Sequence, residues 1–127
     1  MEALKRKVQD MNLSNKVFFT GFCEDMRSFY SSIDCLIHPA EYEPFGIVMI
    51  EAMRYGLPVI STSTAGGIEI LGDIDEGKWL VPLDGYQEMG RLMLDMVKNS
   101  DRISSISQSF YEKFDKNYRL STAMKKM

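Results

Sequence analysis

The fold of this chain is decided by one stretch of its sequence, His38-Pro39-Ala40-Glu41-Tyr42-Glu43-Pro44-Phe45-Gly46-Ile47-Val48-Met49-Ile50-Glu51-Ala52-Met53. The apolar run at 33–37 before it is typical of a β-strand, and two prolines and a glycine then predict a loop. An apolar, helix-forming segment begins at Ile47. The first N–H groups of a helix have no partner inside the helix and therefore bind anions. This order of strand, loop and helix predicts an anion site.

Two carboxylates flank the predicted anion site. Glu43 lies in the loop before the helix, and Glu51 lies more than one turn inside it. A diphosphate at the helix start would leave one carboxylate for hydroxyl groups on each side, which is the layout of a nucleotide sugar. Two other interpretations stay open. Most carboxylates are simply exposed, and paired acids also serve glycoside hydrolysis. Glu51 stands in an apolar run, where a buried charge needs a partner.

Length and composition limit the classes of function. The chain has 127 residues, 45% of them hydrophobic, which suits one domain with its own core. The net charge of −3 and the absence of a basic block argue against nucleic-acid binding. No apolar run approaches the roughly 20 residues of a membrane span, and the charged first residues lack a signal-peptide core. We therefore expect a cytoplasmic protein, at most peripheral to the membrane. Cys23 and Cys35 lack the companions of a metal site, so we expect no metal.

Along the rest of the chain, the spacing of apolar residues alternates between that typical of helices and that typical of strands. Helices are predicted at 1–11, 24–32, 46–55, 68–71, 86–99 and 101–114, and strands at 16–20, 34–38, 58–62 and 79–82. This order predicts an α/β, Rossmann-like parallel sheet of about four or five strands with helices on both faces. Residues 1–117 form one partial domain, and 118–127 a C-terminal helical tail.

Ligands of such sheets bind outside the carboxyl ends of the strands. The loops at 21–24, 38–46 and 63–67 each follow a predicted strand and should meet at that edge. Gly66 and Gly67, in the last of these loops, are predicted either as a plain turn or as a close backbone approach to phosphate or sugar.

Several motifs together resemble one enzyme family. They are Glu43-Pro44-Phe45-Gly46 running to Glu51-Ala52-Met53, Gly56-Leu57-Pro58-Val59-Ile60, and Gly66-Gly67-Ile68-Glu69. The combination is similar to the C-terminal, donor-binding domain of the GT-B glycosyltransferases of family 4, the retaining group 1 enzymes with a Glu-x7-Glu motif. The resemblance covers nearly the whole chain. It implies transfer of a sugar from a nucleoside-diphosphate sugar to a saccharide or lipid-linked acceptor, without a metal or cofactor. Lipopolysaccharide or capsule assembly is the commonest setting.

The resemblance also implies roles for individual residues. Glu43 would hold hydroxyls of the donor sugar as a positioning group, and Glu51 would bind the ribose. The backbone around Phe45, Gly46, Ile47 and Val48 would receive the sugar and the distal phosphate, and Gly21 and Phe22 would lie near the base. His38, the only histidine, inherits no role, because the family's functional histidine belongs to the other domain.

The family's enzymes contain more than this chain shows. They have two Rossmann-like domains with the active site between them, and the donor domain begins with a strand–helix unit that carries an Arg or Lys for the diphosphate. Neither that unit nor the acceptor domain is seen before Met1. We therefore expect weak nucleotide binding and no transfer by the isolated chain. The alternative is a non-catalytic truncated or split nucleotide-binding module that needs a separate acceptor domain. A related phosphorylase or epimerase is a further alternative.

Overall fold

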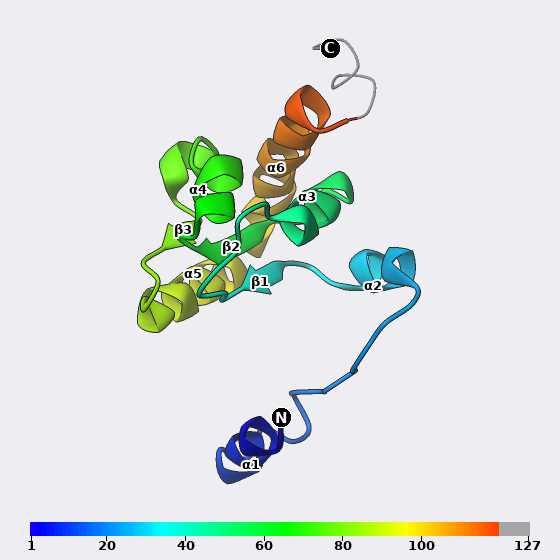
Figure 1. Cartoon of the computed structure of the whole chain (residues 1–127), viewed down its shortest axis with the longest axis vertical. Coiled ribbons are helices and arrows are strands. Elements are labelled where there is room, and N and C mark those ends of the chain that lie inside the picture. The colour runs from blue at the N-terminus through cyan, green and yellow to red at the C-terminus, as the bar shows by residue number, and fades with distance from the viewer. Residues whose placement is uncertain (120–127) are drawn as a thin grey trace.

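The structure, a computed structural model, describes residues 1–119 as an α/β fold (Figure 1). Its helices are α1 (Glu2–Asp10), α2 (Met26–Ser32), α3 (Ile47–Arg54), α4 (Ala65–Leu71), α5 (Tyr86–Lys98) and α6 (Ile103–Asn117), with short 3-10 helices at Asp75–Gly77 and Ser100–Arg102. Its strands are β1 (Leu36–His38), β2 (Val59–Thr62) and β3 (Leu80–Val81). From α2 onward, this order is the predicted one. The predicted tail lies outside the described residues from residue 120.

The three strands form one parallel sheet in the order β1-β2-β3. Leu36 of β1 pairs with Val59 of β2, and Ser61 of β2 pairs with Leu80 of β3. All four residues of β2 are buried, as expected for the central strand. β3 is an edge strand, as the proline at its end predicted. The sheet has fewer strands than the four or five predicted.

The predicted strand at 16–20 is not formed, and this is why the count is lower. These residues lie on a segment that runs from α2 away from the sheet to α1 (Figure 1) and pair with no strand among the described residues. Phe18 is 75% exposed, and α1 has no buried residue. Alternating apolar residues show that a segment suits a sheet, but they do not supply the neighbouring strand whose backbone must pair with it.

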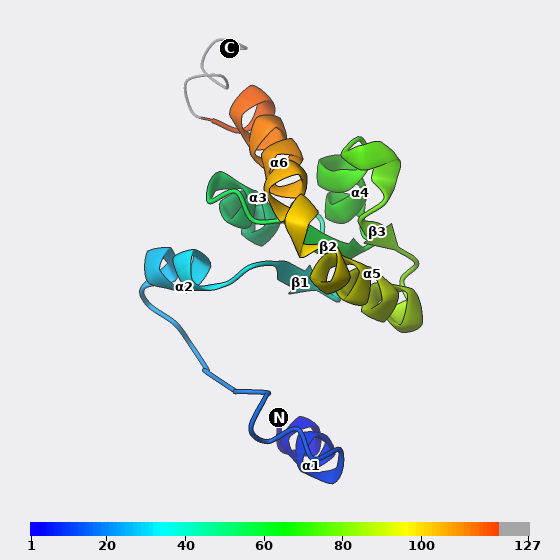
Figure 2. The ribbon, with the colours of Figure 1, turned by 180° about the vertical axis from the view of Figure 1, so that it is seen from behind.

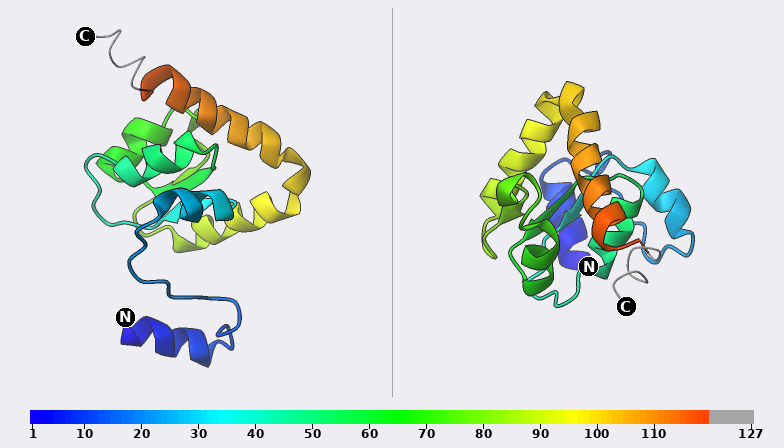
Figure 3. Two further views of the ribbon diagram at one scale, coloured as in Figure 1. Left: turned by 90° about the vertical axis from the view of Figure 1, so that its right-hand side faces the viewer. Right: turned by 90° about the horizontal axis from the view of Figure 1, so that it is seen from above.

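Helices cover both faces of the sheet, as predicted. Figure 3 (left) shows α3 and α4 on one side of the sheet and α5 on the other. α6 then turns back from the end of α5 and packs along α3 (Figure 2). The core between these layers is apolar and includes Met49, Ala52, Met53, Val59, Ile60, Ile70, Leu71, Trp79, Met89, Met96 and Phe110. This packing fixes α3, and with it the flanking carboxylates, against β1 and β2.

We expect the backbone amides of residues 16–20 to exchange with solvent almost without protection, whereas those of β2 exchange only on global unfolding. The reason is that unpaired, exposed backbone opens at almost no free-energy cost. Hydrogen exchange followed by NMR or mass spectrometry measures both in one sample. Protection at Phe18 and Phe19 equal to that at Val59 and Ile60 would contradict the structure of this segment.

Candidate functional site

The loops after β1 and β2 meet at the carboxyl edge of the sheet, as predicted. The hydroxyl of Thr62, the last residue of β2, donates a hydrogen bond of 2.5 Å to the carbonyl oxygen of Ala40. The N–H of Gly66 donates one of 2.7 Å to the carbonyl oxygen of Glu43. The loop between β1 and α3 is therefore fixed at two points.

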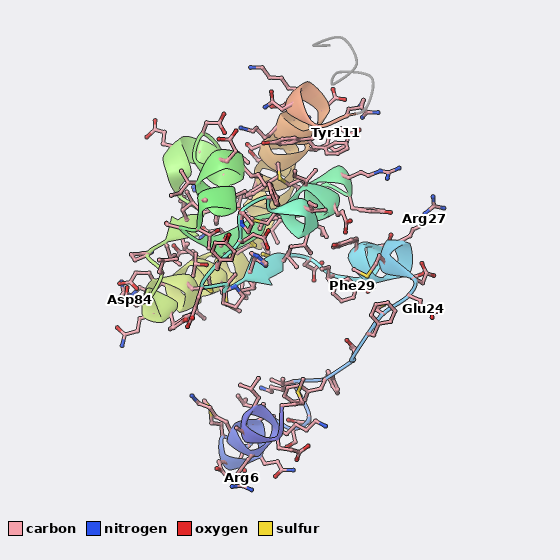
Figure 4. The ribbon with its side chains drawn as sticks, viewed as in Figure 1. Arg6, Glu24, Arg27, Phe29, Asp84 and Tyr111 are labelled. Carbon is pink, nitrogen blue, oxygen red and sulfur yellow. The ribbon has the colours of Figure 1, made fainter. Side chains whose placement is uncertain are left out.

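The third predicted loop is not at this edge. Gly21 and Phe22 lie on the segment that precedes α2 and runs away from the sheet (Figure 1), and Phe22 is 90% exposed. Figure 4 shows Arg27 projecting outward from α2 and Glu24 on the segment just before the helix. Because residues 16–20 form no strand, nothing brings Gly21 and Phe22 beside Glu43 in this structure.

α3 begins at a glycine that no other residue replaces without strain. Gly46, its N-cap, has φ +69° and ψ +32°, a left-handed conformation. A Cβ at this position would lie 2.4 Å from Ile70 Cδ1 and 2.7 Å from Met49 Cε. The close packing brings the start of α3 against the start of α4. The N–H groups of Ile47 and Val48 in the first turn have no acceptor inside the helix.

The carboxylate of Glu43 occupies this helix start. Its Oε1 accepts hydrogen bonds from the N–H groups of Gly46, at 2.8 Å, and Phe45, at 3.3 Å. The pKa of the Glu43 carboxyl is held below its usual value. The bond from Gly46 is the largest cause, and the bond from Phe45 and the nearby His38 ring add to it. The carboxylate is thus ionised at neutral pH, and the position favours a negative charge. Two of the four N–H groups predicted to receive a ligand are taken by the chain's own anion.

His38 lies beside Glu43. It is the last residue of β1, and its Nε2 is 3.6 Å from Glu43 Oε2. This Nε2 is buried and has no hydrogen-bond partner among the described residues, which is uncommon for a buried polar atom. Sequence reasoning gave His38 no role. The feature of the sequence that could have indicated a role is the position of His38 at the end of the strand that leads into the site loop.

Glu51 has a partner from another helix. The hydroxyl of Tyr30 in α2 donates a hydrogen bond of 2.9 Å to its Oε2. Tyr30 is only 2% exposed and stacks on Tyr55, with ring centroids 5.5 Å apart. Burial first, and then the bond to Glu51, raise the pKa of the Tyr30 hydroxyl. The apolar run around Glu51 predicted a partner without identifying it. Glu51 itself is exposed and keeps further lone pairs for a ligand.

A groove opens beside Glu51, between α3 and α6. Its volume is about 540 Å³, and Arg54, Tyr111 and Tyr118 are among the residues that line it. Figure 4 shows Tyr111 on α6. The residues at the start of α3 do not line this groove, so it is adjacent to the candidate site and reaches it only through Glu51.

Gly66 and Gly67 lie inside α4, which corrects the predicted loop at 63–67. The helix begins at Ala65 because the Thr64 hydroxyl accepts a hydrogen bond of 3.0 Å from the N–H of Gly67, the usual role of an N-cap threonine. A Cβ on Gly66 would lie 2.8 Å from the carbonyl oxygen of Glu43 and 2.9 Å from the nitrogen of Gly46. The close backbone approach predicted at these glycines is therefore made to the site loop itself.

We expect Gly66→Ala to lower the free energy of unfolding by about 1–3 kcal/mol, the range for overpacking a tight contact. The Cβ would meet backbone atoms, which cannot turn aside. Gly90→Ala is the matched control, because Gly90 is also helical and nothing lies within 4 Å of its added Cβ. That change should stabilise the fold by roughly 0.5–1 kcal/mol. Urea unfolding compares the two, and equal effects would contradict the packing described here.

In residues 1–119 no three His, Cys, Asp or Glu side chains are grouped so that they could hold a metal ion. In the same part of the chain no helix has the length and apolar character needed to cross a membrane.

The comparisons with known proteins all point to the same family. The family "Glycosyl transferases group 1" matches residues 1–119. The uncharacterized glycosyltransferase MJ1607 of Methanocaldococcus jannaschii is 31% identical over 109 residues, which are 82% of this chain and 28% of that protein. The mannosylfructose-phosphate synthase of Agrobacterium fabrum is 37% identical over 110 residues, 85% of this chain and 24% of that protein. The chain thus spans less than a third of the length of these relatives.

Solved structures share the fold. The C-terminal domain of the group 1 glycosyl transferase LpcC from Francisella tularensis has a TM-score of 0.84 and 25% identity, over 94% of this chain and 62% of that one. Anabaena HepE, solved with UDP and glucose, has a TM-score of 0.87 and 23% identity, over 98% of this chain and 34% of that one.

Proposed function

Because the chain belongs to the glycosyl transferases of group 1, we propose that it is the donor-binding portion of a retaining glycosyltransferase. The complete enzyme moves a sugar from a nucleoside-diphosphate sugar to a saccharide or lipid-linked acceptor. One observation carries the proposal: the start of α3 already holds an anion, the Glu43 carboxylate, through the N–H groups of Phe45 and Gly46. The structure of HepE with UDP and glucose supports the same class of ligand.

The spacing along α3 fits a nucleoside diphosphate. A helix rises about 1.5 Å per residue, so Gly46 and Glu51 are separated by about 7.5 Å along its axis. That is about the distance from a diphosphate to the hydroxyls of its own ribose. We assign the phosphates to the N–H groups at the start of α3, the ribose to Glu51 and the sugar hydroxyls to Glu43. The assignment of the base to Gly21 and Phe22 rests only on the family resemblance.

These contacts would each act in the transfer reaction. When the bond between the anomeric carbon and the diphosphate breaks, negative charge develops on the leaving phosphate oxygens. N–H groups fixed by a helix stabilise this charge without reorganising. Glu43 orients the sugar by accepting hydrogen bonds from its hydroxyls. The acceptor hydroxyl oxygen forms the new bond to the anomeric carbon, and its proton passes to the leaving phosphate. In this assignment Glu43 and Glu51 hold the donor, in contrast to the acid and base of a glycoside hydrolase.

A second candidate is a non-catalytic, truncated or split nucleotide-binding module that needs a separate acceptor domain. The observation that favours it is that the contacts described at the site, at the start of α3 and at Glu51, all serve a donor. The two candidates share the donor site and differ in whether an acceptor domain completes it in the same polypeptide.

We expect the 127-residue chain to bind nucleoside diphosphates with dissociation constants of roughly tens of micromolar to millimolar and to transfer no sugar. Only part of a cleft contributes to binding, so the affinity is low. Calorimetry with UDP, GDP and ADP, and product analysis with the matching nucleotide sugars, measure the two quantities. The free nucleosides are the control and should bind at least tenfold more weakly. Robust turnover by the purified chain would refute the prediction that its site is incomplete.

A further inference from the structure

The Glu43 carboxylate lies between two sets of partners, and only one of them is within hydrogen-bond distance in this structure. Its Oε1 accepts hydrogen bonds from the N–H groups of Gly46 and Phe45. Its Oε2 faces His38 Nε2 at 3.6 Å. That distance is within reach of an ionic attraction but is longer than a hydrogen bond. A small rotation of the carboxylate toward the ring would close it.

The His38 ring is held in place with one polar atom unused. Its Nε2 is buried, without a hydrogen-bond partner among residues 1–119. The residue is fixed in β1, where it pairs with Ser61 of β2. Burying a polar atom without a partner is destabilising. A buried, unpartnered nitrogen that faces a carboxylate of the site indicates a contact made in another state of the molecule.

The main chain of Glu43 cannot supply the movement that would complete this contact. Its carbonyl oxygen is bonded to the N–H of Gly66 at 2.7 Å, and Thr62 holds the preceding Ala40. The side chain can supply it, because it is bonded only through one oxygen to N–H groups that a ligand would also bind. A phosphate and a carboxylate cannot share those N–H groups without like-charge repulsion.

We propose that His38 is a positioning residue that receives the Glu43 carboxylate when the phosphate of a nucleotide sugar takes the N–H groups of Phe45 and Gly46. This inference rests on the proposed function. In the bound state the ring donates its Nε2–H to Oε2 of Glu43, which satisfies the buried nitrogen and keeps the carboxylate beside the sugar. The neutral tautomer with the proton on Nε2 is sufficient, so no proton is taken up or released.

The proposal predicts coupling between His38 and Glu43 in nucleotide binding. In His38→Ala the carboxylate has no second partner and competes with the phosphate for the N–H groups, so affinity should fall about tenfold. In Glu43→Gln the competing charge is absent, and adding His38→Ala should change affinity by less than about twofold. His38→Gln keeps an N–H donor at a similar reach and should restore most of the affinity.

The test is a double-mutant cycle with the full chain and UDP, GDP and ADP, using whichever binds the wild type most tightly. The coupling described above supports the proposal. An equal loss from His38→Ala in both Glu43 backgrounds would mean a structural role only and would overturn it. If no nucleotide binds the wild type, the proposed function fails as well. If a nucleotide binds but His38 and Glu43 are not coupled, this inference is refuted and the proposed function is not.

A measurement on the wild type covers the case in which His38→Ala fails to fold. The ¹⁵N signals of the ring report its tautomer and hydrogen bonding. Saturation with the nucleotide should move the Nε2–H proton downfield, as a hydrogen bond to a carboxylate forms. The same titration of Glu43→Gln should leave it nearly unmoved. Unchanged ring signals in the saturated wild type would refute the relocation of Glu43.

Discussion

Gly46→Ala is expected to lower the free energy of unfolding by about 2–4 kcal/mol and to remove detectable nucleotide binding. Two effects add. The left-handed conformation costs a residue with a Cβ about 1–2 kcal/mol, and overpacking against Ile70 and Met49 costs about as much again. The Cβ would lie 2.4 Å from Ile70 Cδ1. Ile70 and Met49 are buried, so the ends of their side chains can give way only partly. We expect the rest of the relief to come from a shift at the start of α3, which carries the proposed phosphate contacts, so stability and binding should fall together.

The matched control for this change is Gly56→Ala. Gly56 is also left-handed, with φ +73°, but nothing lies within 4 Å of its added Cβ. It should therefore show only the conformational cost, about 1–2 kcal/mol, and should keep nucleotide binding. Urea unfolding and calorimetry of the two variants separate packing at α3 from backbone conformation in general. Similar losses of stability in both variants would show that the contact between the starts of α3 and α4 is not tight.

Glu51→Gln is expected to weaken nucleoside-diphosphate binding by about 10- to 100-fold. A hydrogen bond to a charged group contributes about 1.5–3 kcal/mol, and the proposed ribose contact depends on the charge of Glu51. Glutamine keeps an oxygen that can accept the Tyr30 hydroxyl, so the fold should stay within about 1 kcal/mol of wild type. Calorimetry gives the affinity, and urea unfolding checks the fold.

Two further variants make the Glu51 result specific. Glu88→Gln on α5 makes the same change of charge on the other side of the sheet and should leave affinity unchanged. Tyr30→Phe keeps the buried ring but removes the 2.9 Å bond that orients Glu51. It should weaken binding by only a few-fold and cost about 1 kcal/mol of stability. If Glu51→Gln binds within twofold of wild type, Glu51 does not hold the ribose.

The fold from β1 to α6 could be predicted because local signals and tertiary packing agree there. The run before His38 is apolar and forms β1, Pro82 marks the edge strand β3, and Gly46 marks the start of α3. The segment at 16–20 shows the limit of such signals. Val17, Phe18 and Phe19 have a strand's composition, yet a strand exists only where a neighbour offers its N–H and C=O groups. Sequence periodicity does not say which neighbour that is.

The site could be predicted in its parts but not in its internal contacts. Glu43, Gly46 and Glu51 follow from the strand, loop and helix pattern and from the family resemblance. The hydrogen bond from Tyr30 to Glu51 joins residues in different helices, and no spacing along the chain encodes it. The contact between His38 and Glu43 is closer in sequence, but it depends on how the intervening loop folds. Both contacts depend on how the loop and the helices are arranged in three dimensions.

NMR tests most directly whether the start of α3 and Glu51 hold a nucleoside diphosphate. A ¹⁵N-labelled chain is titrated with UDP, GDP and ADP, and amide shifts are mapped onto the sequence. We predict that at least one nucleotide shifts the amides of residues 45–51 most strongly, with those of α5 unmoved. A folded chain in which none of the three nucleotides shifts residues 46–51 would contradict the claim.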